Sequence, residues 1–388
     1  MKTEDLDKLA HHFMITTLGV QPGENVWIEH ESARGLALAE ACMVAVDAAG
    51  GQGYLRDSSA AKLEEFISAA DSEAIEAEGE RLLDDMKTMR RYIRITDPMD
   101  QSSISVPMTE YSRAMGAMKE HRVNHTKWLV VGTPAKDAYE GVEESAEEFE
   151  QSYLNVCLLD YGRMAEAVQP LVELLNRSKK VHIKGPETDL TFSIEGVGAV
   201  PCTGEINIPD GECFTAPVRD SMNGTIRYNV PTVCQGTSFP WIKFTVVNGR
   251  IEDAQTEPHL VDALNTILDT DPGARYFGEW AMGFNPYVLY PIKSTLFDEK
   301  IAGSFHLTPG NCYETAPNGN KSAVHWDIVL IQRPEHGGGE IWIDDVLIRK
   351  DGLFVPKELQ GLNPENLAPS GTRPVPKPGK AVEANILK

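Results

Sequence analysis

Two patterns of apolar residues follow one another along the chain. In the first 160 residues, short apolar runs alternate with segments of helical period. The runs lie at 25–28, 53–55, 92–95 and 128–131, and the helical segments at 3–18, 33–48, 60–88 and 107–120. Strands that alternate with helices usually form a parallel sheet, because the chain needs a crossover to return to the same edge. We therefore predict an N-terminal α/β domain with a mainly parallel sheet.

After a helix near 161–176, strand patterns dominate. The expected strands lie at 181–184, 190–194, 225–228 and 242–247. The dipeptides Asn223-Gly224 and Asn248-Gly249 are typical of antiparallel hairpin turns. This change predicts an α/β domain at 1–165, a strand-rich α+β domain at 178–358, and a Pro-rich tail at 359–388.

Charge narrows the choice of partners. The 388 residues carry 36 Lys plus Arg and 58 Asp plus Glu, a formal net charge of −22. Such a balance repels nucleic acid and anionic membranes. No apolar stretch reaches the roughly 20 residues of a membrane span, and the first residues lack the pattern of a signal peptide. We expect a cytoplasmic protein that binds neither nucleic acid nor membrane.

The six cysteines form no Cys-x-x-Cys pair, which predicts reduced thiols.

The clearest chemical signal is a histidine and an aspartate two residues apart. His325 and Asp327 lie in a segment of strand character, 322–330, so both side chains point to one side. An imidazole and a carboxylate on one face make half of a metal site. Taken alone, such a pattern is more often a His–Asp hydrogen-bonded pair than a set of metal ligands.

Three further residues favour the metal site. Glu212 and Glu279 are acids within apolar, Gly-flanked segments, and acids are seldom buried unless they are paired or bind a metal. His306 follows the charged turn Asp298-Glu299-Lys300, and Tyr313 comes seven residues later. Each residue alone is compatible with an exposed loop, but together they need a common explanation.

These residues lie in motifs that resemble a known family. From about Val181 to Val355 the chain is similar to the thermophilic metalloprotease family of aminopeptidases. The likeness is carried by Asn207-Ile208-Pro209-Asp210-Gly211-Glu212-Cys213-Phe214-Thr215-Ala216-Pro217, by Gly278-Glu279, by Leu296-Phe297-Asp298-Glu299-Lys300-Ile301-Ala302-Gly303-Ser304-Phe305-His306 and by His325-Trp326-Asp327. The segment from Val20 to Val26 fits the family as well. Thr308-Pro309 departs from the small apolar pair that other members tend to have there.

The resemblance implies a metal-dependent aminopeptidase, usually dimeric, with two divalent ions of zinc, cobalt or manganese and a bridging hydroxide. The positions that match the family's metal ligands are Glu212, Glu279, His306, His325 and Asp327. Tyr313 matches a tyrosine beside the metals and is expected to donate to the oxyanion. Glu212 is expected to act as the general base. The substrate would be a peptide or a small amine-bearing molecule.

Two other readings stay open. His306, His325 and Asp327 alone would form a mononuclear site with open positions, suited to an enzyme acting on an aromatic amine or a hydroxypyridine, either an aminohydrolase or a dioxygenase. Retention of Glu212 and Glu279 argues against it. The other reading is a binding protein with an inactive site, and the intact set of ligands argues against that.

Overall fold

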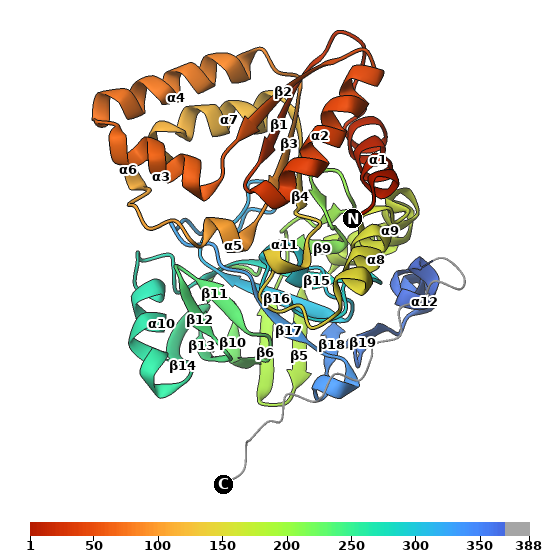
Figure 1. Ribbon diagram of the computed structural model, residues 1–388. Coiled ribbons are helices and arrows are strands. Elements are labelled where there is room, and N and C mark those ends of the chain that lie inside the picture. Colours follow the sequence, from red (N-terminus) through yellow and green to blue (C-terminus); the bar gives the residue numbers. More distant parts are fainter. Residues whose placement is uncertain (369–388) are drawn as a thin grey trace. The chain divides into compact units, whose positions relative to one another are not determined.

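A computed structural model describes residues 1–368 of the chain (Figure 1). Two compact units are formed. The first comprises Met1–Leu158 and Gly204–Pro209, and the second comprises Leu159–Thr203 and the chain from Asp210 onward. The boundary between 165 and 178 that the sequence suggests stays a prediction.

The first unit is built on a five-stranded sheet in the order β2-β1-β3-β4-β8. Its strands are β1 (Asn25–His30), β2 (Gln52–Asp57), β3 (Arg91–Thr96), β4 (Lys127–Gly132) and β8 (Asn207–Ile208). Every pairing is parallel, which confirms the predicted α/β architecture.

Helices cover both faces of this sheet, with α1 and α2 on one side and α4 and α7 on the other (Figure 1). The α-helices of this unit are α1 (Thr3–His11), which continues as a π-helix over His12–Thr17, α2 (Ala33–Ala48), α3 (Ala60–Ala69), α4 (Ser72–Lys87), α5 (Pro98–Gln101), α6 (Thr109–Ala114), α7 (Gly116–His125) and α8 (Ala146–Cys157). The single helix predicted at 60–88 is in fact two. Asp71 interrupts it, because its side chain accepts a hydrogen bond from the backbone N–H of Ala74 and caps α4.

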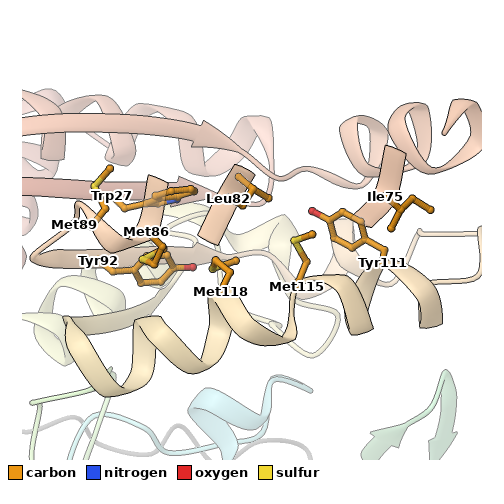
Figure 2. Packing of buried hydrophobic residues seen from close by; sticks show 9 residues of the cluster. All are labelled: Trp27, Ile75, Leu82, Met86, Met89, Tyr92, Tyr111, Met115 and Met118. Carbon is orange, nitrogen blue, oxygen red and sulfur yellow. The ribbon is translucent and has the colours of Figure 1, made fainter. Parts of the chain in front are cut away.

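A methionine-rich core fills the space between the sheet and α4, α6 and α7 (Figure 2). Its buried members are Trp27, Ile75, Leu82, Met86, Met89, Tyr92, Tyr111, Met115 and Met118. The Tyr92 hydroxyl donates to Glu29 at 2.7 Å, so this aromatic side chain is satisfied at its polar end.

The second unit opens with α9 (Tyr161–Arg177) and is otherwise rich in strands, as predicted. Its larger sheet is antiparallel and comprises, in spatial order, β14 (Arg250–Gln255), β13 (Ile242–Val247), β10 (Asn223–Tyr228), β6 (Thr188–Ser193), β5 (Lys180–Gly185), β18 (Glu340–Ile343), β19 (Val346–Lys350) and β20 (Leu353–Phe354). Two further strands, β11 (Thr232–Cys234) and β12 (Thr237–Phe239), form a hairpin, and α10 (Val261–Leu268) follows β14.

One of the two predicted turns is confirmed and one is wrong. Asn248-Gly249 joins β13 to β14 with positive φ at both residues, as an Asn-Gly hairpin turn requires. Asn223-Gly224 instead begins β10 and pairs with β6. Glycine is needed there for a different reason, because a Cβ on Gly224 would lie 2.0 Å from the Asp189 carbonyl oxygen.

A smaller antiparallel sheet has the order β17-β16-β15-β9-β7. Its strands are β7 (Val200–Cys202), β9 (Glu212–Thr215), β15 (Phe277–Gly283), β16 (Ser304–Pro309) and β17 (Ile328–Ile331), and the short helix α11 (Thr295–Asp298) precedes β16. Every residue of β9, β15 and β16 is buried. Polar side chains on these strands must therefore find their partners inside the protein.

The described chain ends in a 3-10 helix, Lys357–Leu362, and α12 (Pro364–Leu367). Leu359, Leu362 and Leu367 are buried. The rest of the predicted tail, 369–388, lies outside the described residues. All six cysteines are free thiols, as expected. Within residues 1–368, every helix is too short or too polar to cross a membrane.

Candidate metal centre

The smaller sheet brings three of the predicted ligands to one face. Antiparallel partners project to the same side of a sheet, and Gly283 lies opposite Glu212 while Ala281 lies opposite His306. Glu279 shares that side of β15 because it alternates with Ala281 and Gly283. Gly283 is needed for a close contact, because a Cβ there would lie 2.7 Å from the Ile301 carbonyl oxygen and 2.8 Å from the Glu299 carbonyl oxygen in the segment before β16 (Figure 1 shows the strands).

The other two predicted ligands, His325 and Asp327, lie beyond the loop that follows β16. His325 forms an isolated bridge with Gly310, and β17 begins only at Ile328, so the predicted strand 322–330 is shorter than expected. Close approach makes the bridge depend on glycine: Gly310 has φ +109°, and a Cβ there would lie 2.0 Å from the Val324 carbonyl oxygen. The predicted common orientation of His325 and Asp327 is nevertheless present, with Nε2 and Oδ1 3.4 Å apart.

The five side chains meet in one buried cluster. His306 Nε2 lies 3.4 Å from Glu279 Oε1, and His325 Nε2 lies 3.3 Å from Glu279 Oε2. On the opposite edge of its ring, His306 Nδ1 lies 3.8 Å from Glu212 Oε2. The His306 side chain is 1% exposed. The structure thus brings together every residue that matches a family ligand.

Backbone and hydroxyl groups orient the ligands. His325 Nδ1 lies 2.9 Å from the Asn311 carbonyl oxygen, so Nδ1 is the donor and Nε2 faces the acids. Thr308, buried on β16, donates from Oγ1 to Asp327 Oδ1 at 2.7 Å. Such outer contacts fix the tautomer and direction of metal ligands in known sites.

The donor atoms fit a divalent cation. Glu212 Oε2, His306 Nδ1 and His325 Nε2 are buried and have no hydrogen-bond partner among the described residues. Buried polar atoms seldom stay unpaired, since each costs about 1–3 kcal/mol. Imidazole nitrogens combined with carboxylate oxygens suit zinc, cobalt and manganese.

The carboxylates and imidazoles shift one another's pKa values strongly in the metal-free protein. Burial alone would lower the pKa of each histidine, but the carboxylates outweigh it and raise the pKa of His306 to about 9 and of His325 to about 11. Burial would likewise raise the pKa of Asp327, yet His325 and His306 hold it well below its usual range. The pKa of Glu212 is raised to about 7, chiefly by burial.

Tyr313 stands at the margin of the cluster. Its ring centroid lies 4.8 Å from that of His325 and 5.5 Å from that of Phe214, and the side chain is 47% exposed. Burial of its ring atoms and the nearby acids raise the pKa of Tyr313 above its ordinary value. The phenol is therefore protonated at neutral pH and can donate a hydrogen bond.

The sequence interpretation missed two acids and a lysine in this cluster. Lys300 is fully buried, and its Nζ lies 2.5 Å from Glu212 Oε1 and 2.7 Å from Glu299 Oε1. Asp210 Oδ1 lies 3.7 Å from the same nitrogen. The charged residues at 298–300 look like an exposed turn, but they are flanked by Leu296-Phe297 and Ile301-Ala302, and that apolar context is the signal for burial.

Comparison with known proteins agrees with this geometry. The thermophilic metalloprotease (M29) family matches residues 2–337. The chain belongs to this family. The resemblance seen in the sequence is thereby confirmed. Aminopeptidase T of Thermus aquaticus is 32% identical over 219 residues, which are 49% of this chain and 50% of that protein. The chain thus spans about half the length of the relative it matches.

Two solved structures share the fold of this M29 chain. AmpT from Thermus thermophilus aligns with a TM-score of 0.74 and 21% identity, covering 91% of this chain and 99% of that one. The 2,5-dihydroxypyridine dioxygenase from Pseudomonas putida aligns with a TM-score of 0.62 and 14% identity, over 92% and 99%. Both likenesses concern the fold, so the chemistry must be argued from the site.

Proposed function

We propose that this chain is a metal-dependent aminopeptidase that hydrolyses the N-terminal peptide bond of peptides, using two divalent ions of zinc, cobalt or manganese. The observation that carries the proposal is the buried cluster of acids and imidazoles with three unpaired ligand atoms. Membership of the M29 family and the relative named aminopeptidase T support it.

Glu212, Glu279, His306, His325 and Asp327 would hold the ions. When bound, the ions would lower the pKa of a water molecule and polarise the scissile carbonyl.

The charge of the buried side chains supports a pair of ions rather than one. The buried carboxylates of Asp210, Glu212, Glu279, Glu299 and Asp327 and the ammonium of Lys300 sum to −5 + 1 = −4 when ionised. Two divalent cations balance this charge, whereas one would leave about two buried negative charges without compensation.

The chain's own residues supply proton transfer and orientation. Glu212 is also proposed as the general base, and Lys300 contacts its Oε1. A glutamate beside the ions can accept a proton from the water and return it to the leaving amine. Tyr313 is proposed to donate from its hydroxyl to the oxyanion.

We further propose a cytoplasmic homodimer. The six free thiols support a reducing compartment. The dimer is supported by the family resemblance, and the mass of the purified protein by light scattering tests it.

The test of the function compares aminoacyl amides that have a free or an acetylated amine. Chelator-treated protein is assayed with each substrate before and after addition of zinc, cobalt or manganese. We expect hydrolysis of the free-amine substrates only, restored by metal, with two ions per chain by metal analysis.

The same samples test the second reading. Oxygen consumption with a hydroxypyridine, or release of ammonia from an aromatic amine, without hydrolysis of any aminoacyl amide would overturn the proposal. A single bound ion in a protein that hydrolyses the amides would overturn the dinuclear site alone.

A further inference from the structure

Two histidines lie side by side on α7, one of the helices that cover the parallel sheet of the first unit (Figure 1). His121 is half-buried and His125 is exposed, and their ring centroids are 4.4 Å apart with an angle of 35° between the ring planes. Among residues 1–368, neither imidazole has a hydrogen-bond or ion-pair partner. The ring nitrogens are therefore available to a ligand that comes from solvent.

The spacing of the two residues is that of a pair of metal ligands on one face of a helix. Residues at i and i+4 are neighbours on the helix surface, with their Cβ atoms about 5–6 Å apart. Two histidines at this spacing on a helix are a known arrangement for binding zinc. None of the five predicted ligands of the buried centre comes from α7, which belongs to the first unit, so this pair is a separate set of donors.

The C-terminal end of α7 is held in place, which fixes the two rings relative to each other. The backbone N–H of Thr126 donates to the Arg122 carbonyl at 3.1 Å, and the Thr126 hydroxyl donates to the same oxygen at 2.6 Å. The Arg122 guanidinium lies 4.9 Å from the ring centroids of both Tyr92 and Trp128, on the side of α7 that faces the sheet. A ligand that binds both imidazoles therefore has little backbone to order, which lowers the cost of binding.

The charges around the pair leave room for a cation. Lys87 of α4 is close enough to act electrostatically on His121, but its ammonium is paired with Asp84 Oδ1 at 2.8 Å. The chain as a whole carries a formal net charge of −22, which attracts cations to its surface.

We propose that His121 and His125 form a second metal site, on the surface of the first unit. Two imidazole nitrogens and no carboxylate favour a divalent transition metal, with Cu²⁺ bound most tightly and Ni²⁺ or Zn²⁺ less so. Water would complete the coordination, because the pair lies at the surface. This site goes beyond the proposed function, since it adds nothing to the buried centre and does not require the chain to be a peptidase.

The experiment measures copper bound by the full chain. The protein is saturated with Zn²⁺, washed with metal-free buffer and dialysed to equilibrium against increasing Cu²⁺ at pH 7.5. Copper and zinc are then counted, and electron paramagnetic resonance reports the nitrogens bound to copper. We expect one copper per chain, coupling to two nitrogens and no loss of zinc. In His121→Asn or His125→Asn the dissociation constant for Cu²⁺ should rise at least about tenfold, because a single imidazole loses the gain from two linked ligands.

Two controls separate chelation from the mere number of histidines. Val123→His combined with His125→Asn keeps that number but places the rings at i and i+2, where they do not face each other. Val123 is 47% exposed, so the change should be tolerated, and we expect Cu²⁺ binding as weak as in His125→Asn. His11→Asn removes an exposed histidine from the adjacent pair His11-His12 and should leave Cu²⁺ binding within about twofold of the wild type.

The outcomes distinguish this site from the buried centre. Wild-type affinity for Cu²⁺ in either single variant of the pair, or in the chain with the shifted histidine, would overturn the α7 site. Copper that binds only as zinc is released would overturn it too, because Cu²⁺ would then occupy the buried centre. A chain that retains no zinc contradicts the proposed function, whereas Cu²⁺ binding that depends on both His121 and His125 still supports the α7 site.

Discussion

The hydroxyl of Thr308 donates a 2.7 Å hydrogen bond to Oδ1 of Asp327. This carboxylate belongs to two groups of potential metal ligands, one with Glu279 and His325 and one with Glu299 and His306. Thr308 belongs to the pair Thr308-Pro309, at which the sequence is expected to depart from the family. Its hydroxyl restricts the direction of the carboxylate of Asp327, a proposed ligand. A small apolar residue could not do this.

Replacing Thr308 by valine should weaken metal binding by roughly tenfold, since valine keeps the shape and removes the donor. Thr308→Ser keeps the hydroxyl and is expected to bind within about threefold of the wild type. Competition between the protein and a chromophoric chelator for Zn²⁺ measures both. Equal affinity in the valine and serine variants would show that the hydrogen bond does not orient Asp327.

The sequence predicted the parts of the fold that depend on local pattern. The parallel strands of the first unit and the Asn248-Gly249 hairpin follow from alternation and turn chemistry, which act over a few residues. Asn223-Gly224 has the same local signature but begins β10, because the close approach of Asp189 from β6 is a long-range constraint.

In the candidate site, too, local sequence patterns do not predict contacts between residues that are distant in the sequence. Glu212 and Glu279 could be singled out because each is an acid in an apolar segment. Lys300 belongs to a charged turn in the sequence, and a run of three charged residues is usually solvated. Its burial is explained only by its contacts with Glu212 and Glu299. The carbonyl of Asn311 that orients His325 is a backbone group, and no side-chain pattern marks it.

Gly310→Ala should impair metal binding through the backbone. Positive φ costs an alanine of order 1–3 kcal/mol, and its Cβ would also collide with the Val324 carbonyl, which displaces the adjoining His325. The control is Gly319→Ala, where φ is +82° but nothing lies within 4 Å of the added Cβ. We expect a loss of stability in both variants by urea unfolding, and at least tenfold weaker Co²⁺ binding only in Gly310→Ala. Unchanged Co²⁺ binding by folded Gly310→Ala would argue against this account.

Metal binding should release protons and tighten as pH rises. The pKa values of about 9 for His306 and about 11 for His325 mean that both rings are protonated in the metal-free protein at pH 7. A cation binds the neutral ring, so the protons must leave, and the apparent affinity increases from pH 6 towards pH 9. Calorimetry at pH 7 in two buffers of different ionisation enthalpy counts the protons. His325→Asn should release fewer. A heat of binding that is independent of the buffer would contradict the prediction.

Shortening a side chain in the methionine-rich core should lower the free energy of unfolding and leave the affinity for metal unchanged. Leu82 is 1% exposed and packs in the cluster of Figure 2, so Leu82→Ala removes buried methyl groups and should cost about 2–5 kcal/mol in the unfolding of the first unit. Every proposed ligand of the buried centre lies in the second unit, and Co²⁺ affinity is therefore expected to stay within about twofold of the wild type.

Val44→Ala is the control, because Val44 is 68% exposed and its truncation should change stability by less than about 0.5 kcal/mol. Urea unfolding followed by tryptophan fluorescence, together with Co²⁺ titration, measures both quantities. A loss below about 1 kcal/mol in Leu82→Ala would mean that the cluster is loosely packed.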